Sequence, residues 1–341
     1  MDHAAMSASN RQITLRERPV GPPGTEHFDI RDVPVTPPQE GEVLLEALYV
    51  SVDPAMRVWI GNNPGYVEPV AIGEVMRGGG VGRVVVSRYD GLVPGDLVQG
   101  RPGWQSRPTL RGEHLQKLDL RLGHALDWMG PLGGTGLTAY VGLFEIGALK
   151  PTDVILVSAA AGGVGQMACQ IAKVYGCRTI GIAGGPKKCD FISDAFGLDG
   201  AIDYKATPNL TAAIQAHCPY GVDLYFDNVG GPILDAAIEN LRPNGRITLC
   251  GRISQTSASE LYGVRNMGLL IGKRGRMSGF IVSDFSAQFA EARQWIAEQV
   301  QAERIRQRLH ILEGLEQAPA GLRMLFESQN FGKLVVKVHD E

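Results

Sequence analysis

The sequence lacks any long apolar run. No uninterrupted apolar stretch reaches the roughly 18 residues that a membrane-spanning helix requires. The first ten residues are polar and contain no apolar core of the kind found in secretory signal peptides, so we expect a loose tail there. A large excess of charge is also missing, because 33 Lys and Arg stand against 36 Asp and Glu. These absences give no reason to expect a membrane or a nucleic acid as a partner.

Cysteine and histidine pairs with the spacing of metal ligands are missing as well. The five cysteines lie between residues 169 and 250 and form no C-x-x-C pair. They are Cys169, Cys177, Cys189, Cys218 and Cys250. The seven histidines show no H-x-x-x-H or comparable pairing. We therefore expect reduced thiols in the cores of a cytoplasmic protein, and no zinc site.

What the chain does have is material for two domains, with 341 residues of which 44% are apolar. From about residue 11 to residue 116, short alternating segments are punctuated by Gly and Pro. This pattern predicts a small, barrel-like, mostly antiparallel β domain. From about Pro131, strands alternate with helices, which predicts an α/β domain with a doubly wound parallel sheet of the Rossmann type.

The second part contains six segments with the length and apolar character of strands. They are Val154–Ser158, Thr179–Ala183, Ala201–Asp203, Asp223–Phe226, Arg246–Cys250 and Met277–Val282. An amphipathic helix is expected over Ser286–Ala302 and a final strand over Lys333–Val338.

The turn after the first of these strands has the spacing of a dinucleotide-binding loop. Ala160-x-Gly162-x-x-Gly165 is that fingerprint with its first glycine replaced by alanine. Gly162 allows the backbone to approach a pyrophosphate, and Gly165 allows helix and strand to pack closely. The segment that follows has the apolar stripe of a helix packed on one face, at Val164, Met167, Ala168, Ile171 and Ala172. A flexible surface turn is the alternative, but the turn stands between a predicted strand and a predicted helix, which favours a cofactor site.

The end of the next strand indicates which dinucleotide binds. An NAD site carries an acidic residue about 20 residues past the glycines, to bond the ribose 2′-hydroxyl. Here the strand ends in Gly184-Gly185-Pro186-Lys187-Lys188, and no carboxylate occurs before Asp190. Two lysines at a helix start oppose the helix dipole, which a merely solvated basic turn leaves unexplained. The pattern therefore favours NADPH, whose 2′-phosphate the lysines would bind.

Short sequence motifs spread over nearly the whole chain resemble those of the zinc-free medium-chain dehydrogenase/reductases, and within them the NADPH-dependent alkenal and enone double-bond reductases. That group includes the leukotriene hydroxydehydrogenase/prostaglandin reductases and the bacterial curcumin reductase. The matching motifs lie at Ser51–Arg57, Met76–Gly82, Gly136–Tyr140, Ala159–Gly165, Gly181–Cys189, Ile202–Lys205, Phe226–Gly231, Cys250–Gln255 and Asn330–Lys333. The zinc-dependent relatives carry a cysteine ligand near Ser51–Asp53 and a Gly-His-Glu motif near Gly78–Gly80, and neither is present here.

The resemblance implies a GroES-like catalytic domain over residues 1–131, an NADPH-binding Rossmann domain over 132–303, and a return of residues 304–341 to the first domain. It also implies the roles of particular residues. Pyrophosphate would lie on Gly162, Gly163, Val164 and Gly165, and the 2′-phosphate on Lys188 and Tyr204. The path from adenosine to nicotinamide would be lined by Asn228, Cys250, Gly251, Ile253 and Ser254, with Phe280, Val282 and Asn330 at the nicotinamide end.

Two departures from the group concern the substrate. Ala55 stands where these reductases often have a tyrosine, and Thr256 stands where they often have a tyrosine that bonds the substrate carbonyl. A threonine hydroxyl can donate a hydrogen bond but is shorter and less acidic. Tyr66 resembles another pocket-lining aromatic, although a packing role explains it equally well.

The resulting hypothesis is an oxidoreductase that delivers hydride from NADPH to the β-carbon of an α,β-unsaturated ketone or aldehyde, with Thr256 and Tyr66 as candidate catalytic residues. Quinone reduction with the same cofactor, or a catalytically weak nucleotide-binding redox sensor, are the alternatives. Carbonyl reduction is disfavoured because zinc normally supplies its electrophile in this superfamily. The edge strand at Met277–Val282, together with the resemblance, predicts a homodimer.

Overall fold

A computed structural model describes residues 9–62, 65–258 and 260–341. The chain divides into two compact units. One unit runs to Met129 and also contains Leu309–Asn330 and Leu334–Glu341. The other contains Gly130–Arg308 and Phe331–Lys333. We refer to them as the β unit and the Rossmann unit.

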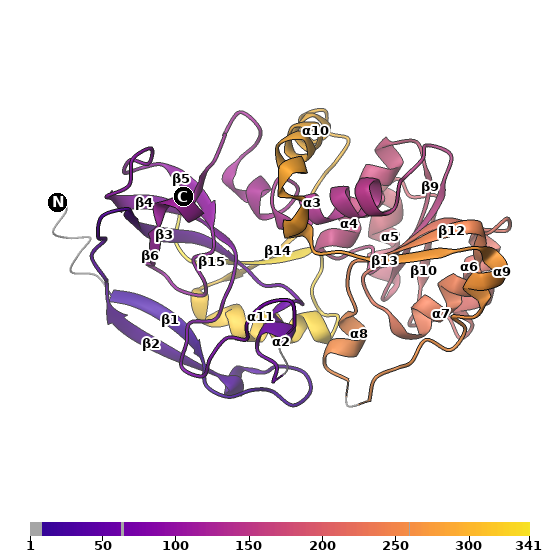
Figure 1. The fold of residues 1–341 in the computed structure, drawn as a ribbon, viewed down its shortest axis with the longest axis horizontal. Coiled ribbons are helices and arrows are strands. Elements are labelled where there is room, and N and C mark those ends of the chain that lie inside the picture. Colours follow the sequence, from indigo (N-terminus) through magenta and orange to yellow (C-terminus); the bar gives the residue numbers. More distant parts are fainter. Residues whose placement is uncertain (1–8, 63–64, 259) are drawn as a thin grey trace. The chain divides into compact units, whose positions relative to one another are not determined.

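The Rossmann unit is built on a six-stranded parallel sheet with the order β10-β9-β8-β11-β12-β13 (Figure 1). Its strands are β8 (Val154–Ser158), β9 (Arg178–Ala183), β10 (Gly200–Asp203), β11 (Val222–Asp227), β12 (Leu241–Leu249) and β13 (Arg276–Gly279). All six predicted strands are present. The chain runs from β8 outward to one edge and then returns to β11 on the other side of β8. This reversal is the topological switch point at which doubly wound sheets bind ligands.

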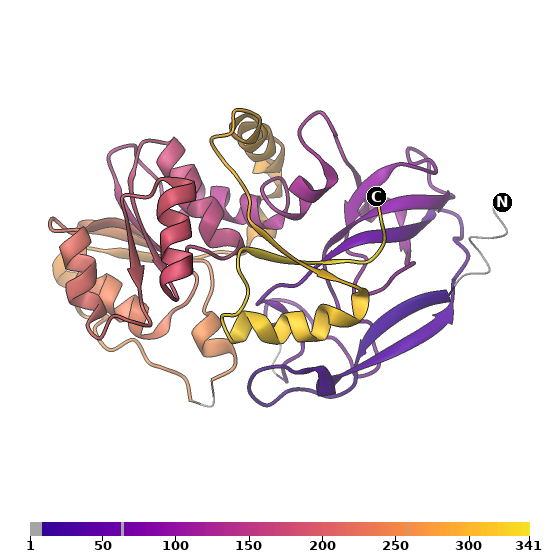
Figure 2. The ribbon, with the colours of Figure 1, turned by 180° about the vertical axis from the view of Figure 1, so that it is seen from behind.

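Helices cover both faces of this sheet (Figures 1 and 2). One face is covered by α3 (Gly134–Val141), α4 (Gly163–Val174), α5 (Pro186–Phe196) and α10 (Phe289–Gln301). The opposite face is covered by α6 (Leu210–His217), α7 (Gly231–Glu239) and α9 (Leu269–Lys273). Side chains alternate between the two cores along each strand, so that Ile155 and Val157 face the first set of helices while Leu156 faces the second.

The sixth strand of the parallel sheet, β13, and the helix that follows it, α10, are shorter than the sequence indicates. β13 ends at Gly279, because its partner β12 ends at Leu249, the residue opposite it. The chain then makes a 3₁₀ turn over Val282–Gln288, so α10 begins at Phe289.

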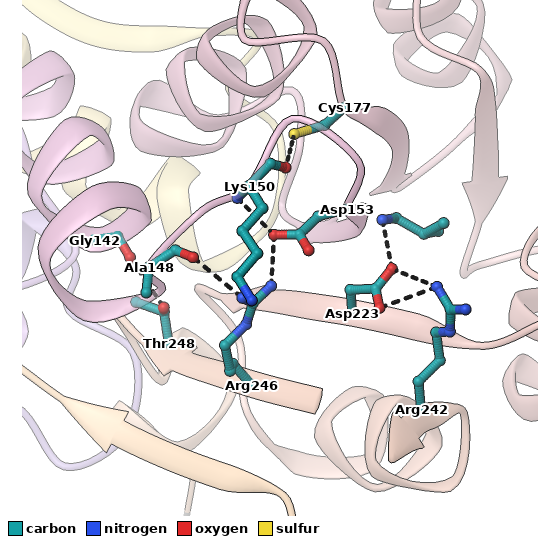
Figure 3. Close-up of polar contacts among 10 residues, drawn as sticks. Gly142, Ala148, Lys150, Asp153, Cys177, Asp223, Arg242, Arg246 and Thr248 are labelled. Carbon is teal, nitrogen blue, oxygen red and sulfur yellow. Dashed lines mark hydrogen bonds and ion pairs between the residues drawn. The ribbon is translucent and has the colours of Figure 1, made fainter. Parts of the chain in front are cut away.

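Ion pairs hold the amino ends of the central strands together (Figure 3). Arg246 and Asp153 form a buried pair with 2.5 Å between Nη2 and Oδ2. Arg246 also donates to the Ala148 carbonyl at 3.1 Å. Asp223 accepts the Val154 N–H at 2.8 Å and is paired with Arg242. These contacts stabilise the amino ends of the strands, whereas a ligand would bind at their carboxyl ends.

The β unit contains the predicted antiparallel domain (Figure 1). Its large sheet has the order β14-β15-β3-β4-β5-β7, with β6 beside β3, and a separate hairpin pairs β1 with β2. The strands are β1 (Ser9–Leu15), β2 (Phe28–Pro34), β3 (Glu42–Ser51), β4 (Gly80–Ser87), β5 (Leu97–Gly100), β6 (Thr109–Arg111), β7 (Gln116–Lys117), β14 (Leu309–Glu313) and β15 (Lys333–Lys337). The short helix α2 (Met56–Trp59) and α11 (Ala318–Phe326) contribute side chains to its core. Among the helices of the described residues, none has both the length and the apolar character needed to cross a bilayer.

Candidate functional site

The turn between β8 and α4 is shaped by its glycines. Gly162 is the N-cap of α4, and its N–H donates to the Ala159 carbonyl at 2.8 Å. A Cβ on Gly165 would lie 2.1 Å from that same carbonyl oxygen, so only glycine lets the helix pass this close to the strand end. The first N–H groups of a helix have no partner within it, and they carry the positive end of the dipole. An anion such as pyrophosphate fits this position.

The alanine in the fingerprint has a structural compensation. Ala160 replaces the first glycine, is fully buried, and donates its N–H to the Ile182 carbonyl at 3.0 Å. Its methyl group lies against Gly181 on β9, where an added Cβ would be only 2.9 Å away. Because Gly181 has no side chain, it leaves room for the methyl group of Ala160.

Residues from the far end of the chain complete this turn within the Rossmann unit. Gly332 donates its N–H to the Ala161 carbonyl at 3.0 Å and forms a bridge with Gly162. Gly332 has φ +87°, and a Cβ there would lie 2.1 Å from the Arg308 carbonyl oxygen. Lys333 is buried, with its Cδ 3.0 Å from the position of a Cβ on Gly163. From the motif Asn330–Lys333, the sequence predicted only Asn330 as a site residue, and not Gly332 or Lys333.

A second turn, after β9, gathers the basic residues. Asp203 at the end of β10 accepts the N–H groups of Gly185 at 2.8 Å and Lys205 at 3.0 Å through Oδ1. A Cβ on Gly184 would lie 2.8 Å from the Tyr204 ring and 3.1 Å from Cε of Lys205. This packing holds Tyr204 and Lys205 beside the turn that leads into α5.

The charge of Lys205 acts on Lys188. The pKa of Lys188, in the first turn of α5, is lowered by burial and by the charge of Lys205. A negative ligand would relieve both effects, which makes the place suitable for a phosphate group. Lys205 was not among the predicted site residues, although it is the last residue of the matching motif Ile202–Lys205. Its role depends on β10 lying beside β9, which only the folded sheet shows.

The segments after β11 and β12 bring together the predicted residues of the nicotinamide path. Asn228 donates Nδ2 to the Ser158 carbonyl at 2.8 Å and accepts the N–H of Ile253 on its own carbonyl at 3.3 Å. Cys250 and Gly251 both donate their N–H groups to the Asp227 carbonyl, at 2.8 and 3.0 Å. These contacts arrange residues 250–254 beside the end of β11.

Ser254 and Thr256 belong to the short helix α8 (Ile253–Thr256). Ser254 is fixed by its hydroxyl, which donates to the Val229 carbonyl at 2.6 Å. The Thr256 hydroxyl donates to the Ile253 carbonyl at 3.1 Å. Thr256 must therefore give up a local bond before it can donate to a substrate. Tyr262, six residues further on, is no substitute for the missing tyrosine, because its hydroxyl donates to Asp235 at 2.6 Å.

Phe280 and Val282 follow the edge strand. A Cβ on Gly142 would lie 3.0 Å from Cζ of Phe280 and 2.6 Å from the Phe226 ring, so Phe280 packs beside the carboxyl half of β11. Val282 begins the 3₁₀ turn before α10. Both residues are half-buried.

In the β unit, Tyr66 lies in a loop that is fastened at both ends. Arg18 donates to the carbonyls of Gly61 and Val70, each at 2.9 Å. The Tyr66 side chain is half exposed, and its hydroxyl accepts a hydrogen bond from Trp59 Nε1 at 3.2 Å. That arrangement leaves the proton of the hydroxyl available to a ligand. Asn330 also belongs to this unit.

The donor groups of the described residues do not fit a metal. No group of three or more His, Cys, Asp or Glu side chains in them is arranged to hold an ion. Burial raises the pKa of Cys177 and Cys250 to about 12, as expected for thiols packed in a core. Cys169, Cys189 and Cys218 have raised pKa values for the same reason.

Comparison with known protein families agrees with both units. Residues 11–118 match the family described as the N-terminal domain of oxidoreductase, and residues 163–298 match the zinc-binding dehydrogenase family. The chain belongs to the medium-chain dehydrogenase/reductases. The second family name refers to zinc, but the residues that it matches begin at Gly163, the first residue of α4, and belong to the Rossmann unit.

Individual relatives of this medium-chain dehydrogenase/reductase match over almost its full length. The NADPH-dependent curcumin reductase of Escherichia coli (strain K12) is 38% identical, over 96% of this chain and 97% of its own. The NADP(+)-dependent 2-alkenal reductase of Nicotiana tabacum is 37% identical, over 99% and 100%. The crystal structure of CurA in complex with NADPH from Vibrio vulnificus is 39% identical, with a TM-score of 0.92, over 97% of this chain and 100% of that one.

Proposed function

We propose that this enzyme uses NADPH to reduce the C=C bond of α,β-unsaturated ketones or aldehydes. The observation that carries the cofactor is the pair formed by Lys188, in the first turn of α5 after β9, and Lys205, just past β10, together with the missing carboxylate that an NAD site would have at the end of β9. The curcumin and alkenal reductases that match the whole chain support the substrate class. When bound, NADPH supplies the hydride.

The protein's own residues have three tasks in this reaction. The α4 N-terminus and Lys188, Tyr204 and Lys205 bind the phosphates. Asn228 and residues 250–254, with Phe280 and Val282, line the nicotinamide path. We infer that the Rossmann unit is the cofactor domain.

The third task concerns the substrate oxygen, on which negative charge grows as hydride reaches the β-carbon. The Tyr66 hydroxyl has a proton to donate, since it accepts from Trp59. Thr256 can contribute only after rotating away from the Ile253 carbonyl. We infer that each hydroxyl, considered by itself, is a candidate to orient the carbonyl and that the α-carbon takes its proton from solvent.

We infer that the enzyme works without zinc, because the cysteine and Gly-His-Glu motif of the zinc-dependent relatives are missing. Five cysteines that form no disulfide are consistent with a reducing, cytoplasmic location.

The enzyme also pairs with a second copy of itself. β13 is the outermost strand of its sheet, and exposed apolar side chains lie on the segment before it, at Leu261, Met267, Leu269 and Ile271. A two-fold partner would cover this edge and these side chains.

The experiment that tests the function follows NADPH absorbance with a panel of enones, quinones and saturated ketones. Turnover of the enones alone supports the proposal. Preferred turnover of quinones would identify a quinone reductase. Tight NADPH binding without turnover of any compound would identify a nucleotide-binding sensor.

A further inference from the structure

Asp227, the last residue of β11, has a fully buried carboxyl group that takes no part in the chemistry proposed above. One of its oxygens, Oδ1, accepts four hydrogen bonds. They come from the Tyr225 hydroxyl at 2.7 Å, the N–H groups of Val229 and Gly230 at 2.9 Å each, and the Ser158 hydroxyl at 3.2 Å.

The other oxygen of the same carboxyl group is used differently. Oδ2 is buried and has no hydrogen-bond partner among the described residues. Burial raises the pKa of Asp227, while its donors act in the opposite direction. The group is therefore a one-sided acceptor, and its value to the fold lies in the four donors that it collects on a single atom.

These donors connect the three strand ends that border the switch point. The Ser158 hydroxyl, at the end of β8, also accepts the N–H of Asn228 at 2.9 Å. The main-chain carbonyl of Asp227 accepts the N–H groups of Cys250 and Gly251, just past β12. One residue thus joins the strand before the pyrophosphate turn, the Asn228 loop and the segment that leads to Thr256.

The loop that Asp227 holds has a conformation in need of an anchor. Gly230 and Gly231 adopt φ values of +73° and +62°. A Cβ on Gly231 would lie 3.1 Å from the side-chain atoms of Ser254 and Gln255. A shift of this loop would therefore also displace α8.

We propose that Asp227 is a positioning residue that fixes Asn228 and residues 250–254 relative to the pyrophosphate turn. The residues that bind the pyrophosphate and those that bind the nicotinamide are then held in the correct positions relative to each other. It acts through the loops and touches neither cofactor nor substrate. The required property is an acceptor oxygen at Oδ1, and the negative charge is not required. The inference rests on the proposed use of NADPH.

The chain offers a matched control on the same strand. Asp223 is also on β11 and also fixes a backbone N–H, that of Val154, but it is near the first residue of the strand whereas Asp227 is the last. Asp223→Ala and Asp227→Ala both remove a carboxylate that holds strands together. Only the second lies at the cofactor side.

The test measures NADPH binding by calorimetry, thermal unfolding, and the isotope effect on turnover with NADPH deuterated at the transferred position. We expect Asp227→Ala to weaken NADPH binding roughly ten- to a hundredfold, because several buried donors lose their acceptor. The isotope effect should rise as the misplaced nicotinamide makes hydride transfer slower. Asp227→Asn keeps an acceptor oxygen and should bind NADPH within about threefold of the parent.

Asp223→Ala should lower the melting temperature yet leave NADPH affinity within about threefold. Equal losses of affinity in Asp223→Ala and Asp227→Ala would overturn the proposal in favour of a general stability effect. Asp227→Asn as defective as Asp227→Ala would overturn it as well, since the charge would then be what matters.

Should Asp227→Ala not fold, Ser158→Ala provides the same test with a smaller change. It removes the acceptor of the Asn228 N–H, and it should weaken NADPH binding severalfold. Unchanged affinity in that variant would contradict the proposal. Because binding is measured directly, a parent enzyme that binds NADPH but reduces no enone would disprove the proposed function and leave this inference intact.

Discussion

The ammonium group of Lys205 lowers the pKa of Lys188, although the two lysines belong to different strand–helix connections of the Rossmann unit. Two like charges held near one another favour a negative ligand between them. Asp203, the nearby acid at the end of β10, is already engaged with the N–H groups of Gly185 and Lys205. The site is thus arranged for a phosphate and not for a ribose hydroxyl.

Lys188→Ala should therefore weaken NADPH binding about ten- to a hundredfold, the value of a lost charge-assisted contact, while sparing NADH. Calorimetric titration with both cofactors measures this. Lys187→Ala is the comparison variant and should cause the smaller loss, because Lys187 is exposed on the same helix turn whereas Lys188 is partly buried near Lys205. Equal losses for NADPH and NADH in Lys188→Ala would refute the assignment.

Purified enzyme should keep full activity after exhaustive chelation and contain no stoichiometric zinc. The reason is the missing ligand pattern among its five cysteines and seven histidines. Elemental analysis of protein made in zinc-supplemented medium is the measurement. About one zinc per chain, lost together with activity on chelation, would disprove the prediction.

The proposed dimer should dissociate when its apolar edge is charged. Ile271 is 83% exposed on α9, the helix that precedes β13, and Ile271→Asp would place an unpaired charge in the proposed contact. Light scattering at micromolar concentration should show a dimer for the parent and a monomer for this variant. Val20→Asp, at a 96% exposed valine of the β unit, should remain dimeric. A monomeric parent would rule out the dimer at that concentration.

Thr256→Val and Tyr66→Phe should each lower turnover by less than about a hundredfold, since loss of an essential general acid costs about 10²–10⁴. The Thr256 change should be the smaller, because its hydroxyl already donates to Ile253. A loss near ten-thousandfold in either folded variant would identify that hydroxyl as the acid.

Labelling tests the same chemistry independently. Turnover in deuterium oxide should place solvent deuterium at the α-carbon, and labelled NADPH should place deuterium at the β-carbon. Label from NADPH at a carbonyl carbon would instead indicate alcohol formation and contradict the proposed reaction.

Much of this molecule follows from local sequence. The strand Val154–Ser158 was predicted to the residue, because a short apolar run before a glycine turn has few other solutions. The positions of Gly162 and Gly165 were equally clear, since a helix cannot pass so close to a strand end with a Cβ in the way. The absence of an acid after β9 could also be read directly.

Other features were decided only when distant segments met. Ser158 and Asp227 are 69 positions apart, and their contact exists because β11 pairs with β8 in one register. Lys205 joins Lys188 because β10 lies beside β9, and Gly332 closes the pyrophosphate turn from the far end of the chain. The Thr256 hydroxyl became a local donor only through the turn of α8. Hydrogen bonds depend on distances of a few tenths of an ångström, and such distances between remote residues are set by sheet register and packing, which no single stretch of sequence contains.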